Sequence, residues 1–153
     1  MVDFGVDVGE AARFAKTVGE TDVYLFAGLS GDFAPNHVNE EYMKATAFGR
    51  RMAHGGLLLA FASTASTIIA GKSLKKDPDY YPVSVGYDRI RFLKPVFIGD
   101  TVTVIYTVVE LMPDRERARS KIETHNQRGE LVMVGEHILQ WVKSPRHQST
   151  SFA

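Results

Sequence analysis

Apolar residues are most concentrated in the stretch GGLLLAFASTASTIIAG, residues 55–71. Wound as a helix, this stretch is apolar nearly all round, and its polar side chains are small hydroxyls. It falls just short of the roughly 18 uncharged residues that a membrane span requires. The pattern therefore predicts a buried helix from Leu57 to Ala70, closed by Gly71 and packed in the middle of a larger structure.

The period of the hydrophobic pattern changes in the second half of the chain. Residues 82–94 alternate between apolar and polar positions with one slip, as a β-bulge would produce. Residues 101–111 are rich in β-branched side chains, and residues 118–127 form a more polar segment. A turn at residues 127–129 leads into residues 130–143. These four segments are predicted to be antiparallel strands.

Shorter elements are predicted in the first third of the chain. Residues 11–18 read as a short strand. Thr21 is expected to cap a short helix that ends near Gly28. A second short helix is predicted over residues 38–48, with Gly49 as its stop.

One nearly all-apolar helix followed by four strands predicts an α+β fold. A helix this hydrophobic needs cover on several sides, and a single curved antiparallel sheet wrapped around it would supply that cover. No repeat, low-complexity block or Pro/Gly/Ser linker divides the sequence. We therefore expect one domain over residues 1–143, followed by a flexible tail over residues 144–153.

Composition excludes several classes of function. Lys plus Arg number 18 and Asp plus Glu number 18, so no global field recruits nucleic acid or an anionic membrane. Cysteine is absent, which excludes disulfides and thiolate catalysis and is compatible with a cytoplasmic location. The N-terminal residues show no secretory pattern. The histidines other than His37 are scattered without metal-ligand spacing, so no metal is expected. No G-x-S-x-G motif is present, which disfavours a serine hydrolase, and no phosphate-binding glycine loop is present.

The stretch GDFAPNHVNEEYMK, residues 31–44, offers candidate chemistry because it holds an acid and an imidazole around a proline. In one interpretation, Asp32 caps the following turn and His37 is a half-buried polar residue. In the other, Asp32 and His37 are an acid/base pair that holds one water molecule, and Pro35 fixes the bend between them. The spacing alone does not decide between the two.

The segment AHGGLLLAF, residues 53–61, places two glycines where the long helix begins. Gly55 and Gly56 either only break the chain or leave the backbone N–H groups of the helix start open to a ligand. Such a helix start favours negative charge, for example on an acyl oxygen that becomes enolate-like. No Asp or Glu occurs between Met43 and Lys76, so an acidic catalyst has to come from elsewhere.

Three segments together resemble the MaoC-like dehydratase family, which includes (R)-specific enoyl-CoA hydratases. Residues 31–63 are similar to its hydratase signature, which runs Asp, any residue, Asn, Pro, an aliphatic residue and His, with His-Gly at a helix start after some fifteen residues. RIRFLKPVFIGDTVTV resembles the family's Pro-Val-x-x-Gly-Asp-x-Val segment, and NQRGELVMVGEHILQW its closing strands. The resemblance covers about residues 8–143. It implies a hot-dog fold, assembled as a homodimer or a dimer of dimers.

The resemblance also implies site residues and a substrate. Asp32 and His37 match the family's catalytic pair, which would add water to a trans-2-enoyl-CoA and give an (R)-3-hydroxyacyl thioester. Gly55 matches the residue whose backbone N–H binds the thioester carbonyl. Ser63 matches a supporting serine of the central helix. The implied partner is an acyl-CoA or an acyl carrier protein thioester, with no separate cofactor.

This sequence departs from the family pattern at three positions. Ala34 replaces the signature Asn, Asn36 replaces the aliphatic residue, and Gly56 stands where a larger apolar side chain is frequent. Two alternatives therefore stay open. One is a hot-dog acyl-CoA thioesterase, although many of these carry a carboxylate on the central helix. The other is a non-catalytic module that binds acyl thioesters.

Overall fold

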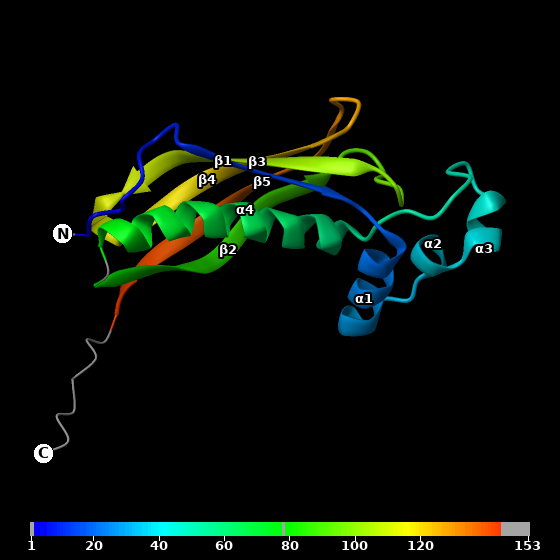
Figure 1. The fold of residues 1–153 in the computed structure, drawn as a ribbon, viewed down its shortest axis with the longest axis horizontal. Helices are drawn as coiled ribbons and strands as arrows, with labels where there is room; N and C mark the ends of the chain where they lie inside the picture. Colours follow the sequence, from blue (N-terminus) through cyan, green and yellow to red (C-terminus); the bar gives the residue numbers. More distant parts are fainter. Residues whose placement is uncertain (1, 78, 145–153) are drawn as a thin grey trace, which may run out of the picture.

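A curved antiparallel sheet lies along one long helix in the computed structural model, which describes residues 2–77 and 79–144 (Figure 1). The helix is α4 (Gly55–Lys76), and the sheet order is β1-β3-β4-β5-β2. The strands are β1 (Ala11–Thr17), β2 (Tyr80–Phe92), β3 (Thr101–Met112), β4 (Arg117–Asn126) and β5 (Leu131–Lys143). A short 3₁₀ turn, η1 (Pro113–Arg115), joins β3 to β4. The predicted α+β hot-dog arrangement is confirmed.

Helix α4 is longer than the sequence pattern predicts. It begins at Gly55 and continues past Gly71 to Lys76. Gly71 costs a helix about 1 kcal/mol relative to Ala, but the next turn is held by tertiary contact. Ser73 is fully buried, and its Oγ accepts a hydrogen bond from the indole Nε1 of Trp141 at 2.7 Å. By length and composition alone α4 would also suit a membrane span, yet one side of it is packed into the core of the domain.

Burial alternates along β3, β4 and most of β5, but not along β2, where the sequence predicts alternation. Along β5, side chains from Met133 to Trp141 alternate between buried and half-buried positions, so one face of the strand points at the core. The predicted slip in β2 is confirmed, since its pairing with β5 is interrupted between Ser84 and Gly86 and again between Asp88 and Arg91. All the strand pairs are antiparallel.

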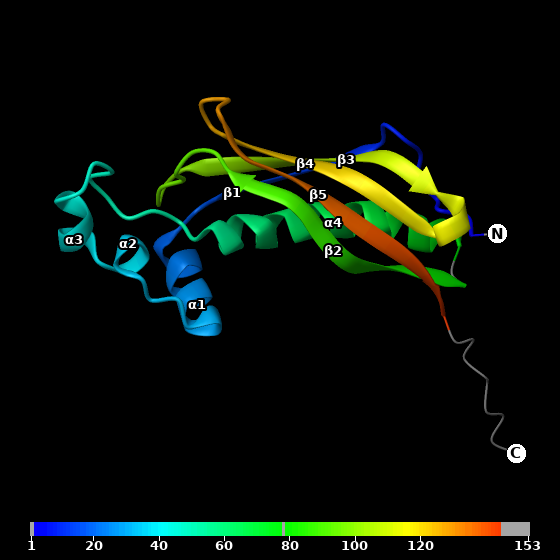
Figure 2. The same cartoon turned by 180° about the vertical axis from the view of Figure 1, so that it is seen from behind.

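Three helices stand beyond the N-terminal end of α4, where they form an extension on one end of the sheet (Figures 1 and 2). The first, α1 (Glu20–Ser30), contradicts the predicted Thr21 cap and Gly28 end. Gly19 is the N-cap, because the carboxylate of Asp22 accepts its N–H at 2.8 Å. Gly31, at φ +79°, ends the helix in the left-handed region that glycine favours.

The predicted second helix is two helices in the structure. These are α2 (Pro35–Val38) and α3 (Glu40–Lys44), and the stop expected at Gly49 falls beyond both. Asn39 separates them because its backbone is extended, with φ −116° and ψ 100°. Its side-chain oxygen accepts the N–H of Tyr42 at 2.9 Å and so caps α3. Because of this split, α2 ends at Val38, one residue after His37. The tail predicted for residues 144–153 lies outside the described residues from 145 onward, and the domain boundary stays a prediction.

His137 is fully buried in the sheet and has polar partners on two other strands. Its Nδ1 lies 2.8 Å from the hydroxyl of Tyr106, and its Nε2 lies 2.7 Å from Oγ of Ser84. Its ring also stacks on Tyr87 at 4.2 Å. Burial lowers the pKa of His137 to about 4 and raises the pKa of Tyr106 to about 12.

We expect this histidine to make the fold less stable in mild acid. The unfolded imidazole takes a proton below pH 6.5, whereas folded His137 stays neutral down to about pH 4. The stability it contributes is therefore complete above pH 6.5 and is lost as the pH falls. Between pH 7 and pH 5 the loss from this residue is about 2 kcal/mol. Urea unfolding at both pH values should show a smaller loss for His137→Gln, and equal losses would contradict the assignment.

Candidate active site

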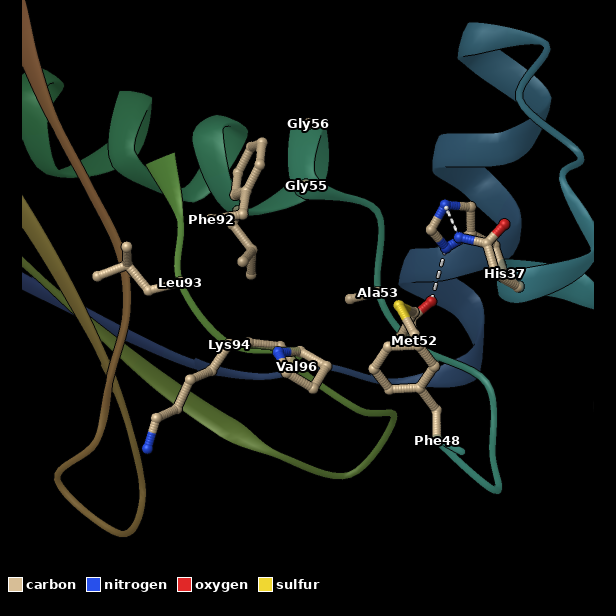
Figure 3. Close-up of a pocket in the computed structure, with 13 residues that line it drawn as sticks. His37, Phe48, Met52, Ala53, Gly55, Gly56, Phe92, Leu93, Lys94 and Val96 are labelled. Carbon is tan, nitrogen blue, oxygen red and sulfur yellow. Dashed lines mark hydrogen bonds between the residues drawn. The ribbon is translucent and has the colours of Figure 1, made fainter. Parts of the chain in front are cut away.

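The structure brings Asp32, His37 and Gly55 together at the N-terminal end of α4. His37 and Gly55 line a pocket of about 600 Å³, and Asp32 lies next to His37 outside that lining. One wall carries His37 and Met52, and the opposite wall carries the start of α4 and the end of β2, where Phe92 lies (Figure 3). Three segments far apart in sequence thus converge where the long helix begins.

His37 is held in one orientation by its neighbours. The ring is buried, and its Nδ1 lies 2.8 Å from the backbone oxygen of Met52. A carbonyl only accepts, so Nδ1 carries the hydrogen, and a neutral ring keeps its lone pair on Nε2. That lone pair accepts from the side-chain amide of Asn36, 3.0 Å away. The backbone N–H of Met52 donates in turn to the carbonyl of Asn36 at 3.0 Å.

Asp32 combines both interpretations that its sequence allowed. One carboxylate oxygen, Oδ1, accepts the backbone N–H of Ala34 at 3.2 Å and closes the turn before α2. The other, Oδ2, faces His37 and lies 4.0 Å from its Nε2. That separation is too long for a direct hydrogen bond and suits a bridging molecule. The carboxylate is half exposed, whereas the imidazole is buried.

His54 belongs to this cluster, although its spacing to the other histidines in the sequence does not indicate it. It is the N-cap residue of α4 and is 1% exposed. Its Nε2 donates to the backbone oxygen of Asp32 at 2.9 Å, and its ring stacks on His37 at 3.7 Å. Nδ1 of His54 is buried with no partner among the described residues. The His-Gly pair at the helix start was the signal that could have identified it.

The two glycines at the start of α4 leave room for aromatic rings. A Cβ on Gly55 would lie 2.6 Å from the ring of Phe92, and a Cβ on Gly56 would lie 2.6 Å from the ring of Phe26. Phe26 of α1 thus fills the space that a larger side chain would occupy at position 56. The N–H groups of Gly55 and Gly56 precede the first hydrogen bond of the helix, in which Leu57 donates to the carbonyl of His54 at 3.1 Å, so they point to the pocket end of α4.

Ser63 is not brought to this pocket. Its side chain is exposed on α4, and the α4 residues that line the pocket are Gly55, Gly56 and Leu58. The backbone oxygen of Ser63 accepts the hydroxyls of Ser66 and Thr67, which bend back onto the helix. The role that the resemblance implies for Ser63 stays a prediction.

Donor atoms of Asp32, His37 and His54 lie within 4.8 Å of one another, as in some metal sites. The arrangement does not favour a metal, however. The two imidazoles are stacked with an angle of 25° between their planes, so their nitrogens do not converge on one point. Nε2 of His54 is also engaged with a backbone oxygen. These contacts suit acid/base chemistry better than coordination.

Comparison with known proteins places this chain in a family. A family model described as MaoC like domain matches residues 4–130. An (R)-specific enoyl-CoA hydratase of Rhodospirillum rubrum is 40% identical over 128 residues, covering 84% of this chain and 83% of that protein. A 3-hydroxybutyryl-CoA dehydratase of Methylorubrum extorquens is 34% identical, covering 94% of this chain and 83% of that protein. The unliganded R-hydratase structure of Pseudomonas aeruginosa has a TM-score of 0.74 and 29% identity, covering 97% of this chain and 94% of that chain. This chain belongs to the MaoC-like family.

Proposed function

We propose that this protein is an enoyl-CoA hydratase that also runs as a 3-hydroxyacyl-CoA dehydratase. It adds water to a trans-2-enoyl-CoA and forms an (R)-3-hydroxyacyl-CoA. The observation that carries the proposal is the pair of Asp32 Oδ2 and His37 Nε2, 4.0 Å apart beside a pocket at a helix N-terminus. The names of the relatives, hydratases and dehydratases of acyl-CoA thioesters, support the same reaction.

The proposed reaction needs only proton transfer and charge stabilisation. Water bound between Asp32 and His37 gives one proton to the pair while its oxygen bonds to Cβ of the enoyl group. The pair then delivers one proton to Cα, so the enzyme ends unchanged and the product has gained one water. The thioester oxygen becomes enolate-like in between. The N–H of Gly55 and the positive end of α4 stabilise that charge. Neither a metal nor a separate cofactor is required.

The direct test is loss of enoyl absorbance on mixing the protein with crotonyl-CoA and with longer or branched enoyl-CoAs. Chiral analysis of the product should give the (R)-3-hydroxyacyl thioester. The thioesterase alternative predicts release of free CoA from acyl-CoA, which a thiol reagent traps. α4 carries no Asp or Glu, which disfavours thioesterases that place a carboxylate on this helix. Tight acyl-CoA binding without turnover over the whole panel would favour the non-catalytic alternative.

We also propose that the protein is a homodimer, formed along the free edge of β2. β2 lies at one edge of the sheet, and an exposed apolar edge strand tends to pair with another chain. Large apolar side chains are exposed on this strand and directly after it: Tyr81, Val85, Phe92 and Leu93. A cytoplasmic location and a place in fatty-acid metabolism complete the proposal, supported by the cysteine-free composition and the acyl-CoA chemistry.

The dimer is testable by sedimentation. Equilibrium runs should give twice the 17.0 kDa chain mass, or four times if two dimers associate. Val85→Lys places a charge on the β2 edge and should shift the protein toward monomer at least tenfold in dissociation constant. Val8→Lys is the matched control, because Val8 is also an exposed valine but precedes β1. A Val85→Lys protein that dimerises like wild type would argue against this edge.

A further inference from the structure

The side-chain amide of Asn36 has no place in the reaction as written above, yet it lies at the reacting atom of His37. Its Nδ2 is 3.0 Å from Nε2. Because Nδ1 of His37 donates to Met52, Nε2 is the acceptor of the neutral ring, and the amide is the donor. Asn36 is half-buried and lines the same pocket as His37. The amide therefore sits where the substrate water has to be held.

The position of Asn36 is fixed as firmly as that of His37. The N–H of Met52 donates to the carbonyl of Asn36 at 3.0 Å, and the carbonyl of Met52 accepts from Nδ1 of His37 at 2.8 Å. Pro35 fixes the first position of α2 just before them. A side chain on such an anchored backbone can hold a small molecule in one place.

The oxygen of the water that is added needs a hydrogen-bond donor, and the amide of Asn36 can be that donor. Both hydrogens of the water are donated, one to Oδ2 of Asp32 and one to Nε2 of His37. Its oxygen then has two lone pairs, of which one attacks Cβ and the other needs a donor. Asp32 and the neutral imidazole offer no hydrogen to that oxygen. Asn36 carries N–H groups within 3.0 Å of Nε2 and can supply one.

We propose that Asn36 is a third catalytic group, whose amide donates to the oxygen of the water that Asp32 and His37 activate. The inference rests on the proposed hydration. In the substrate-free protein the amide donates to Nε2 instead, and the arriving water takes over that lone pair. Asn36 gains and loses no proton in the cycle. It aims the remaining lone pair of the water at Cβ, which is an orientation effect on kcat.

A matched pair of variants tests the proposal. Asn36→Asp keeps the shape of the side chain but replaces the N–H donor by an acceptor, and Asn36→Leu removes the polar group. Asn39→Asp is the control, with the same charge change three residues on, because a carboxylate can still accept the Tyr42 N–H. We expect the two Asn36 variants to lower kcat roughly 10- to 100-fold, with KM and Tm close to wild type. The Asn39 variant should stay within about threefold.

A second readout does not depend on turnover. The ¹⁵N resonance of His37 Nε2 should move toward that of a free imidazole lone pair in Asn36→Leu, and calorimetric binding of butyryl-CoA should be unchanged. Wild-type kcat in both Asn36 variants, an equal loss in Asn39→Asp, or a loss confined to KM or Tm would overturn the proposal. If wild type hydrates no enoyl-CoA, the proposed function fails. The ¹⁵N resonance of His37 Nε2 then tests the contact between Asn36 and His37 by itself. An unchanged resonance in Asn36→Leu would show that this contact is absent.

Discussion

Replacing Asp32 by asparagine is expected to lower kcat/KM for crotonyl-CoA about 10³-fold. The amide oxygen can still accept the N–H of Ala34, which the carboxylate holds at 3.2 Å, so the turn before α2 is kept. The amide cannot take a proton from water, so the chemical step becomes slower. Because the carboxylate is half exposed, the free energy of unfolding should change by less than about 0.5 kcal/mol. Decay of enoyl absorbance and urea unfolding measure the two quantities.

Asp3→Asn is the control for this substitution. Asp3 also accepts a backbone N–H two residues on, from Gly5 at 2.9 Å, but it lies in the segment before β1. Its replacement should leave activity at the wild-type level. Full activity in Asp32→Asn would overturn the role proposed for Asp32, while an equal loss in Asp3→Asn would show that a charge change anywhere in the domain is sufficient.

Replacing His37 by asparagine is expected to lower kcat by about 10³-fold as well, for a separable reason. The amide nitrogen of asparagine falls near Nδ1 of histidine, so it can still donate to the Met52 carbonyl. It has no counterpart of Nε2, so the acid/base atom is removed while the anchor is kept. His37→Ala should lose the same activity and also leave the Met52 carbonyl unpaired, at an additional cost of about 1–3 kcal/mol in stability.

His125→Asn provides the comparison for His37→Asn. His125 lies on β4 and also has a buried Nδ1, which has no partner among the described residues. Its replacement should leave kcat within about threefold of wild type. If His37→Asn retained more than a tenth of the wild-type kcat, Nε2 of His37 would not be the atom that moves the proton.

The sheet and the central helix could be predicted from the sequence because their patterns are long. Alternation with one slip predicts β2, a run of β-branched residues predicts β3, and an apolar run predicts α4. The helix ends could not be predicted as well, since they depend on single contacts. The Trp141–Ser73 hydrogen bond extends α4 past Gly71, and nothing near Gly71 in the sequence indicates it. The extended backbone of Asn39 likewise divides what reads as one helix.

The candidate site shows the same limit. Asp32 and His37 were predicted because they share a short motif. His54 was missed because its partner, the Asp32 carbonyl, is 22 residues away, and its spacing to His37 has no helical or strand period. The contact of Asn36 with Nε2 was equally hidden, because adjacent residues usually point apart. Only the Met52 anchor turns both side chains to one place.

The link between Met52 and the segment that joins β2 to β3 has a consequence for how such an enzyme can diversify. Met52 forms a bridge with Phe97, and the N–H of Ala53 donates to Val96 at 2.7 Å. Met52, whose carbonyl anchors His37, is therefore held to the segment between β2 and β3, downstream of the loop that carries Phe48. Phe48 lines the pocket from this loop. That loop can thus vary in length and side chains, and with it one wall of the pocket, without moving the Met52 anchor that orients His37.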